Sequence, residues 1–232
     1  GVDVFFVLSG YLITSILLRD INARTFSYRR FWERRVRRLA PALAAMVAGA
    51  VFVGACLLMP RDLRDLGRSV VAQSLLVANV FFYRESDYFG APAELMPLLN
   101  LWSLAVEEQF YLIIPSLLSI TLTKLRWRPI TILGGLFAAS FAYSSIQLHR
   151  DPSAAFYLLP SRAWEMLLGS LLATAPRSLI VPGRFRESIA WLSGIAILTA
   201  AMAYDGRTPF PGPLALIPCV GAAGLIWSND SS

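Results

Sequence analysis

Histidine and cysteine are scarce in this sequence, which has one histidine and two cysteines among its 232 residues. A zinc site takes three or four Cys, His or carboxylate ligands, and a disulfide framework takes several cysteines. Cys56 and Cys219 both lie in apolar runs, where we interpret them as packing residues. The composition therefore argues against a metal centre and against a disulfide-stabilised fold.

Charged residues are also few, at 16% of the chain, while 56% of the residues are hydrophobic and the mean hydropathy is +0.57. Soluble domains have about 45–50% apolar residues. The excess lies in long runs, several of which approach or exceed the roughly 18 residues that a helix needs to cross the hydrocarbon core. The sequence therefore predicts an all-α fold, a polytopic bundle of transmembrane helices with the lipid bilayer as a partner.

The charge that is present is mostly positive, with a formal net charge of +6 and a sequence pI of about 9.7. In a soluble protein such a pI would suggest a nucleic-acid partner. Here arginines cluster beside apolar runs, as the positive-inside rule describes for cytoplasmic loops. We therefore expect no nucleic-acid partner.

The apolar runs predict about seven membrane spans. The strongest basic stretch, residues 19–38, follows the first span, so we place it in the cytoplasm and the first helix runs inward. Pro41 is expected in the first turn of the second span, where its missing N–H costs little. No hydrophilic domain interrupts the chain, so residues 1–232 are predicted to form a single membrane domain. The predicted spans are Val2–Leu18, Leu39–Met59, Leu101–Leu122, Ile130–Leu148, Arg162–Ala175, Ile189–Ala203 and Leu214–Trp227.

A further apolar run, Ser69–Tyr83, is only about 15 residues long, which is short for a full crossing. If it crosses, the basic loop Lys124–Arg128 falls outside the cell. If it lies in the interface or re-enters, that loop falls inside. We favour the second arrangement because charge bias sets the orientation of membrane helices.

Three groups of polar residues stand out, because an ionisable side chain at a membrane helix centre costs roughly 2.5–3.5 kcal/mol on insertion scales. In the first group, Ser103, Glu107 and Tyr111 are four residues apart and share one helix face. Glu108 is expected to point elsewhere. A carboxylate at Glu107 could orient a general base, bind an acceptor hydroxyl or pair with an arginine.

The second group contains two nested Arg-x-x-Arg pairs, Arg34 with Arg37 and Arg35 with Arg38. Each pair would present two guanidinium groups on one side of a helix, in the forked geometry that suits phosphate oxygens. Arginines at a cytoplasmic helix end also serve as topology anchors and contact lipid headgroups. From the residues alone we favour the role of topology anchor, and phosphate binding remains an alternative.

In the third group, Arg162 and Glu165 are three residues apart, so they are expected to pair locally. Gly169 permits close helix packing one turn later, and Ser9-Gly10 is expected to make a similar close contact. The pattern leaves a structural pair and a functional pair equally open. The single histidine, His149, is expected at a solvated helix end.

The segments that contain these residues resemble acyltransferase family three, and the resemblance covers essentially the whole chain. The first and third segments carry it most specifically. The matching segments, in order, are Gly1–Ile13, the arginine stretch ending at Pro41, Trp102–Leu112, Ser161–Gly169 and the late Phe210-Pro211-Gly212.

The resemblance implies a membrane-bound O-acyltransferase of the bacterial inner membrane. Such an enzyme would transfer an acyl group, typically acetyl, from acyl-CoA on the cytoplasmic side to a hydroxyl of a cell-envelope polysaccharide or another extracytoplasmic acceptor. By motif, Arg35 and Arg38 match the family's Arg-x-x-Arg pair and Glu107 matches its carboxylate. Arg162 and Glu165 match a further charged pair. No metal is implied.

The resemblance also implies a catalytic histidine in a helix upstream of the Gly1–Ile13 segment, and His149 does not match that position. We expect both ends of the chain to continue in a parent protein and little turnover from residues 1–232 alone. Two alternatives remain: a transporter of a glycan or lipid-linked intermediate, and an inactive remnant of the enzyme. A transporter is expected to contain repeated halves, and the sequence has no internal repeat.

Overall fold

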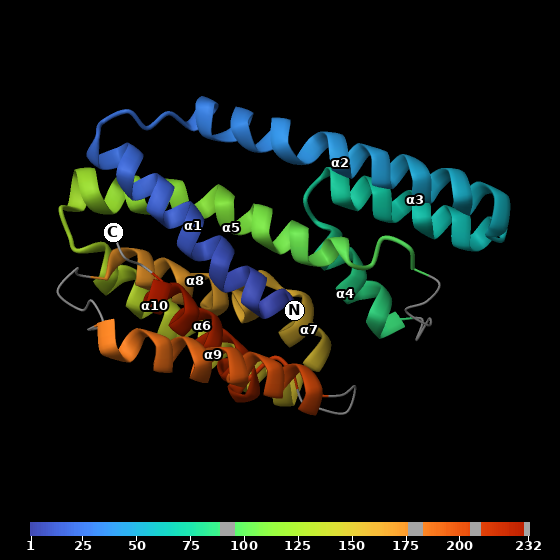
Figure 1. Ribbon diagram of the computed structural model, residues 1–232. Helices are drawn as coiled ribbons and strands as arrows, with labels where there is room; N and C mark the ends of the chain where they lie inside the picture. Colours follow the sequence, from blue (N-terminus) through green and yellow to red (C-terminus); the bar gives the residue numbers. More distant parts are fainter. Residues whose placement is uncertain (89–95, 176–182, 205–209, 230–232) are drawn as a thin grey trace. The chain divides into compact units, whose positions relative to one another are not determined.

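The computed structural model describes residues 1–88, 96–175, 183–204 and 210–229. Every regular element in these ranges is a helix, which confirms the all-α prediction (Figure 1). The chain forms two compact units, one comprising Gly1–Arg19 with Phe110–Ser232 and the other Asp20–Gln109. Whether residues 1–232 act as a single membrane domain stays a prediction.

The first unit contains most of α1 and everything from the middle of α5 onward. The second unit contains α2, α3, α4 and the first turns of α5. The helices are α1 (Val2–Asn22), α2 (Tyr28–Leu57), α3 (Pro60–Ser74), α4 (Ala78–Tyr88), α5 (Leu101–Ser119) with its π-helical extension η2 (Ile120–Leu125), α6 (Pro129–Arg150), α7 (Pro152–Tyr157), α8 (Leu159–Thr174), α9 (Gly183–Ala203), the 3-10 turn η4 (Pro213–Ala215) and α10 (Leu216–Asn229).

Four of the described helices are long and apolar enough to cross a membrane. They are α1, α2, α5 together with η2, and α6. The helix formed by η4 and α10 is apolar but shorter. These findings indicate a multi-pass membrane protein, and the number of about seven spans stays a prediction.

Helix α2 begins well before the predicted start of its span. It runs without a break from Tyr28 to Leu57, so the part of the arginine stretch from Arg29 to Arg38 lies on its first turns. The expectation that Pro41 sits in the first turn is therefore wrong, because Pro41 lies inside the helix. Arginine is a good helix former, which explains the earlier start. Proline in a helix interior removes one backbone hydrogen bond but leaves this helix continuous.

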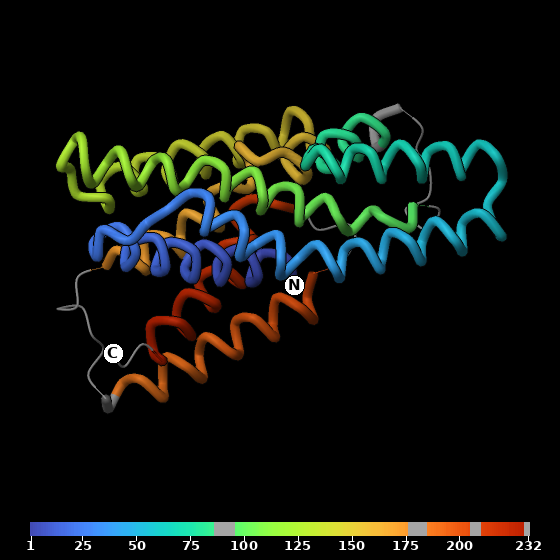
Figure 2. Tube along the Cα trace, turned by 90° about the horizontal axis from the view of Figure 1, so that it is seen from above, coloured from blue at the N-terminus to red at the C-terminus, as the bar shows by residue number. Residues whose placement is uncertain are grey.

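The run Ser69–Tyr83 is broken into two helices. Helix α3 ends at Ser74 and α4 begins at Ala78, and between them Leu76 has a φ of 59°. Helix α3 has 15 residues, or about 22 Å at 1.5 Å per residue, which is short of the roughly 30 Å hydrocarbon core. Figures 1 and 2 show α3 returning alongside α2 and α4 turning back again. This excludes one continuous spanning helix here and favours the interfacial or re-entrant alternative.

In the first unit, α6 packs against α8, and α9 packs against α10. The core joins residues from α1, α8 and α10, including Val7, Trp164 and Cys219. Cys219 is thus a packing residue, as predicted, whereas Cys56 is exposed on α2.

Helices α1 and α8 cross in backbone contact. A Cβ added to Gly10 would overlap the carbonyl oxygen of Met166, and one added to Gly169 would overlap that of Val7. Beside the crossing, the hydroxyl of Thr14 donates a hydrogen bond to Ser170 Oγ at 2.8 Å. The predicted close contacts at Gly10 and Gly169 are therefore confirmed. Gly10 of α1 lies against α8, and Gly169 of α8 lies against α1.

Candidate functional site

The second unit holds an arginine between two carboxylates. Arg35 on α2 donates from Nε to Oε1 of Glu108 at 2.6 Å and from Nη2 to Oε1 of Glu107 at 3.3 Å. The side chains of Glu107 and Glu108 are only 5% and 7% exposed, and that of Arg35 is 16% exposed. Two buried neighbouring carboxylates need such a cation, because uncompensated charge in a low-dielectric interior is costly.

The prediction that Glu108 points away from this site is wrong, since it makes the shorter of the two contacts. Adjacent helical residues point about 100° apart around the axis, at 3.6 residues per turn. The planar guanidinium group of Arg35 has donors on two edges, so it reaches both carboxylates. On the predicted polar face, Tyr111 is buried, while Ser103 is partly exposed and its hydroxyl bonds the Asn100 carbonyl.

The other three arginines of the nested pairs lie on the surface. Arg34 contacts Asp20 at 3.2 Å, and Arg37 contacts Glu33 at 2.7 Å one helical turn away. Arg38 is exposed, and the structure gives it no ion pair within the described part of the chain. Exposed ion pairs contribute about 0–1 kcal/mol, so a phosphate could displace the partners of Arg34 and Arg37.

A polar network next to the carboxylates fixes the break between α3 and α4. The side-chain amide nitrogen of Gln109 donates to the carbonyl of Leu76 at 2.7 Å and to Oδ1 of Asn79 at 2.8 Å. Backbone outside helices at membrane depth must find such partners within the protein. The sequence pattern did not identify Gln109 and Asn79 as partners, although an amide side chain on an apolar helix is a signal of such a partner.

The first unit contains a second buried ionic group. Arg162 donates from Nη1 to Oε1 of Glu165 at 2.6 Å and to Oδ1 of Asp3 at 3.1 Å. The local pair of Arg162 with Glu165 is therefore confirmed, and it is completely buried. Asp3 was missed as a partner. Its position as the one acid in an apolar run was the available signal, because intramembrane acids are almost always paired.

Aromatic rings enclose the Arg162 guanidinium group. The rings of Phe6, Phe156 and Phe210 have their centroids 5.4–5.7 Å from its central carbon, within the range of cation–π attraction. Asp3, Phe156 and Phe210 also line a cavity of about 590 Å³. The cluster ties α1 to α8 and places polar atoms beside an otherwise apolar space.

The one histidine, His149, is exposed in the last turn of α6, as expected. In the parts of the chain that the structure describes, no group of three or more His, Cys, Asp or Glu residues is arranged to hold a metal ion.

The sequence pattern of the acyltransferase domain matches residues 1–230. The chain belongs to acyltransferase family 3. It is 29% identical over 242 residues to an uncharacterized protein of Haemophilus influenzae, covering 99% of this chain and 98% of that protein.

Two named relatives are longer than this chain. The peptidoglycan O-acetyltransferase OatA of Listeria monocytogenes is 40% identical over 185 residues, and the O-acetyltransferase OatA of Staphylococcus aureus is 35% identical over 180 residues. In both cases the match covers 75% of this chain but only 29% of the relative. No solved structure matches the chain.

Proposed function

We propose that this chain forms the membrane part of an O-acyltransferase of the bacterial inner membrane. It would transfer an acetyl group from acetyl-CoA in the cytoplasm to a hydroxyl of a cell-envelope polysaccharide, with peptidoglycan as the first candidate. The class of reaction rests on membership of acyltransferase family 3. The acceptor rests on the peptidoglycan O-acetyltransferase among its relatives.

The observation that carries the site is the contact of Arg35 with Glu107 and Glu108. It joins the arginine stretch of α2 to the buried carboxylates of α5, two segments that carry the family resemblance. Arg38, one turn beyond Arg35 and exposed, would bind the phosphates of the donor. Arg34 and Arg37 would add to the positive field at this helix end.

In this proposal Arg35 is shared between two tasks. It holds Glu107 in place from one edge, and it contributes positive charge near the donor. Glu107 would accept a hydrogen bond from the acceptor hydroxyl or from the general base. Arg162 and Glu165, being buried with Asp3, would act by fixing α8 against α1 beside the cavity that Asp3 lines.

The reaction forms one bond and breaks another. The acceptor hydroxyl oxygen attacks the thioester carbonyl carbon, the new ester C–O bond forms, and the C–S bond to CoA breaks. The hydroxyl proton passes through a general base to the CoA sulfur. The resemblance implies a histidine for this base, and His149 is not a candidate because it lies exposed at a helix end.

The test uses the full-length protein in detergent with labelled acetyl-CoA and solubilised peptidoglycan glycan fragments. We expect wild type to form labelled ester on the glycan. Arg38→Ala should raise the KM for acetyl-CoA, while Glu107→Gln should lower kcat. Arg126→Ala, an exposed arginine on another loop, is the control and should leave both constants unchanged. Wild-type protein that transfers no acyl group under any donor would overturn the proposal.

A further inference from the structure

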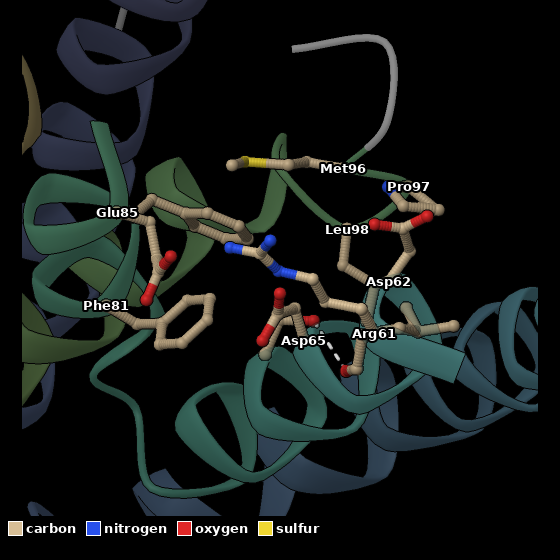
Figure 3. Close-up of a pocket in the computed structure, with 11 residues that line it drawn as sticks. Arg61, Asp62, Asp65, Phe81, Glu85, Met96, Pro97 and Leu98 are labelled. Carbon is tan, nitrogen blue, oxygen red and sulfur yellow. Dashed lines mark hydrogen bonds between the residues drawn. The ribbon is translucent and has the colours of Figure 1, made fainter. Parts of the chain in front are cut away.

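The second unit contains a cavity of about 260 Å³ that is separate from the Arg35 site (Figure 3). It lies between the first half of α3, the helix α4 and the segment that leads into α5. Its walls combine one guanidinium group, three carboxylates and apolar side chains. The principal lining residues are Arg61, Asp62, Asp65, Phe81, Glu85 and Met96.

The charged side chains converge on this cavity. In Figure 3, Arg61 reaches across it toward Glu85, and Asp65 lies beside the arginine on the same helix. Asp65 also accepts a hydrogen bond from Arg68 at 3.1 Å, outside the cavity lining. Hydrogen-bond donors and acceptors thus face the same small volume.

This mixture suits a hydroxyl-rich ligand. A sugar hydroxyl both donates and accepts hydrogen bonds, and it can satisfy a carboxylate and a guanidinium group at once. The aromatic rings of Phe81 and Phe82 supply apolar surface for the carbon face of a sugar ring. The volume of about 260 Å³ is below the roughly 300 to 1,000 Å³ of ligand pockets that enclose a whole small molecule. It therefore fits a short segment of a longer chain.

The position of the cavity within its unit agrees with an extracytoplasmic ligand. Arg61 lies in the first turn of α3, directly after the end of α2. The arginine stretch, which the positive-inside rule places in the cytoplasm, lies on the opposite end of α2. A helix of 30 residues is about 45 Å long, so in this topology the cavity and the first turns of α2 would lie at opposite membrane surfaces.

Two other cavities are less suitable for a polar chain. The larger one beside Asp3 is lined mostly by apolar side chains, and its carboxylate is engaged by Arg162. A third, lined by residues of α3 and α4, is also mostly apolar. The 260 Å³ cavity differs from these two in its lining, which combines an arginine with three carboxylates.

A polar face of α3 continues inward from the cavity. Asp65, Ser69 and Gln73 are four residues apart, and Ser69 also lines the cavity. Gln73 is 2% exposed, and neither of its amide atoms has a hydrogen-bond partner among the described residues. This face ends near the break that Gln109 holds, next in sequence to Glu108.

We propose that this cavity is the subsite that binds a saccharide segment of the acceptor glycan, with Arg61, Asp65 and Glu85 as its hydrogen-bonding residues. The inference rests on the proposed acyl transfer and adds where the acceptor is held. Sugar hydroxyls would hydrogen-bond to these three side chains, and a ring face would pack on Phe81.

The test compares two arginines on one helix. Arg61 and Arg64 are both exposed on α3, but only Arg61 lines the cavity. With full-length protein, acetyl-CoA and peptidoglycan glycan fragments, Arg61→Gln should raise the KM for the fragments by about tenfold or more, the effect of losing a hydrogen bond to a charged group. Arg64→Gln should leave it unchanged. Glu85→Gln should act as Arg61→Gln does.

Donor affinity is measured in parallel, by binding of labelled acetyl-CoA to the same preparations. Unchanged donor binding with a raised acceptor KM supports the subsite. Normal KM for the fragments in both Arg61→Gln and Glu85→Gln overturns it and leaves acyl transfer intact. Transfer to a protein acceptor, with no transfer to glycan fragments, also overturns it. Absence of any transfer in the wild type would instead remove the proposed function.

Discussion

The guanidinium group of Arg35 lies 2.6 Å from the carboxylate of Glu108 and 3.3 Å from that of Glu107, so it contacts two acids that are adjacent in sequence. One positive charge thus faces two negative charges in a largely buried setting. Removing the cation from such a group leaves uncompensated charge at a cost of about 3–5 kcal/mol. This relationship makes Arg35 the residue on which the site depends most.

Arg35→Lys is therefore expected to be damaging although it keeps the charge. Lysine has a single ammonium group and cannot present donors to two carboxylates from two edges. We expect acyl transfer to fall by about 10–100-fold, as when one charge-assisted hydrogen bond is lost. The measurement is kcat in detergent with labelled acetyl-CoA. Arg150→Lys, at the exposed end of α6, is the control. Wild-type kcat in Arg35→Lys would contradict the two-point contact.

The crossing of α1 and α8 predicts a sharp difference between two glycines. Gly169→Ala should destabilise the protein by about 1–3 kcal/mol or prevent folding, because its Cβ would overlap a backbone carbonyl that cannot move aside. Gly135→Ala on α6 meets nothing within 4 Å and should be neutral or slightly stabilising. Thermal unfolding followed by size-exclusion chromatography would measure both. Equal stability of the two variants would argue against the backbone contact.

The break between α3 and α4 predicts opposite outcomes for two glutamines. Gln109→Leu removes the hydrogen bonds to Leu76 and Asn79 and should cost about 1–3 kcal/mol, since buried polar groups are left without partners. Gln73→Leu removes a buried amide that has no partner among the described residues and should be neutral or stabilising. Thermal stability of the two variants gives the comparison. A stable Gln109→Leu protein would show that the network does not hold the break.

The re-entrant arrangement predicts the sides on which two loops lie. With Cys56→Ser as background, Asn100→Cys should react with an impermeant thiol reagent from outside intact cells. Arg126→Cys should react only after the inner membrane is opened, because α5 then runs inward to the basic loop. Both positions are exposed. Labelling of Arg126→Cys in intact cells would mean that Ser69–Tyr83 crosses the membrane as a whole.

Much of the fold follows from the sequence because long apolar runs and arginine clusters carry strong signals. The helices around Leu101–Leu122 and Ile130–Leu148 lie where the pattern places them. The start of α2 did not follow, because charged residues continue a helix as readily as apolar ones do. The break at Leu76 did not follow either, since it depends on Gln109, which is distant in sequence.

The sequence predicts the contacts of the two ionic groups that lie within one helix, but not those between separate helices. Spacing alone identifies the local pair of Arg162 and Glu165, because residues three apart meet on a helix. It cannot identify Asp3 or Glu108 as partners, since those contacts depend on how separate helices pack. A charged residue in an apolar run indicates that an ion-pair partner exists, but it does not show which residue that partner is.

The most direct test of acyl transfer across the membrane at the Arg35 site uses full-length protein reconstituted in sealed vesicles. Labelled acetyl-CoA is supplied only on the face that carries the arginine stretch of α2, and peptidoglycan glycan fragments only on the other. We expect labelled ester on the glycan fragments, and loss of that product in Arg35→Ala at normal protein levels. Transfer that requires donor and acceptor on the same face, or that survives in Arg35→Ala, would contradict this expectation.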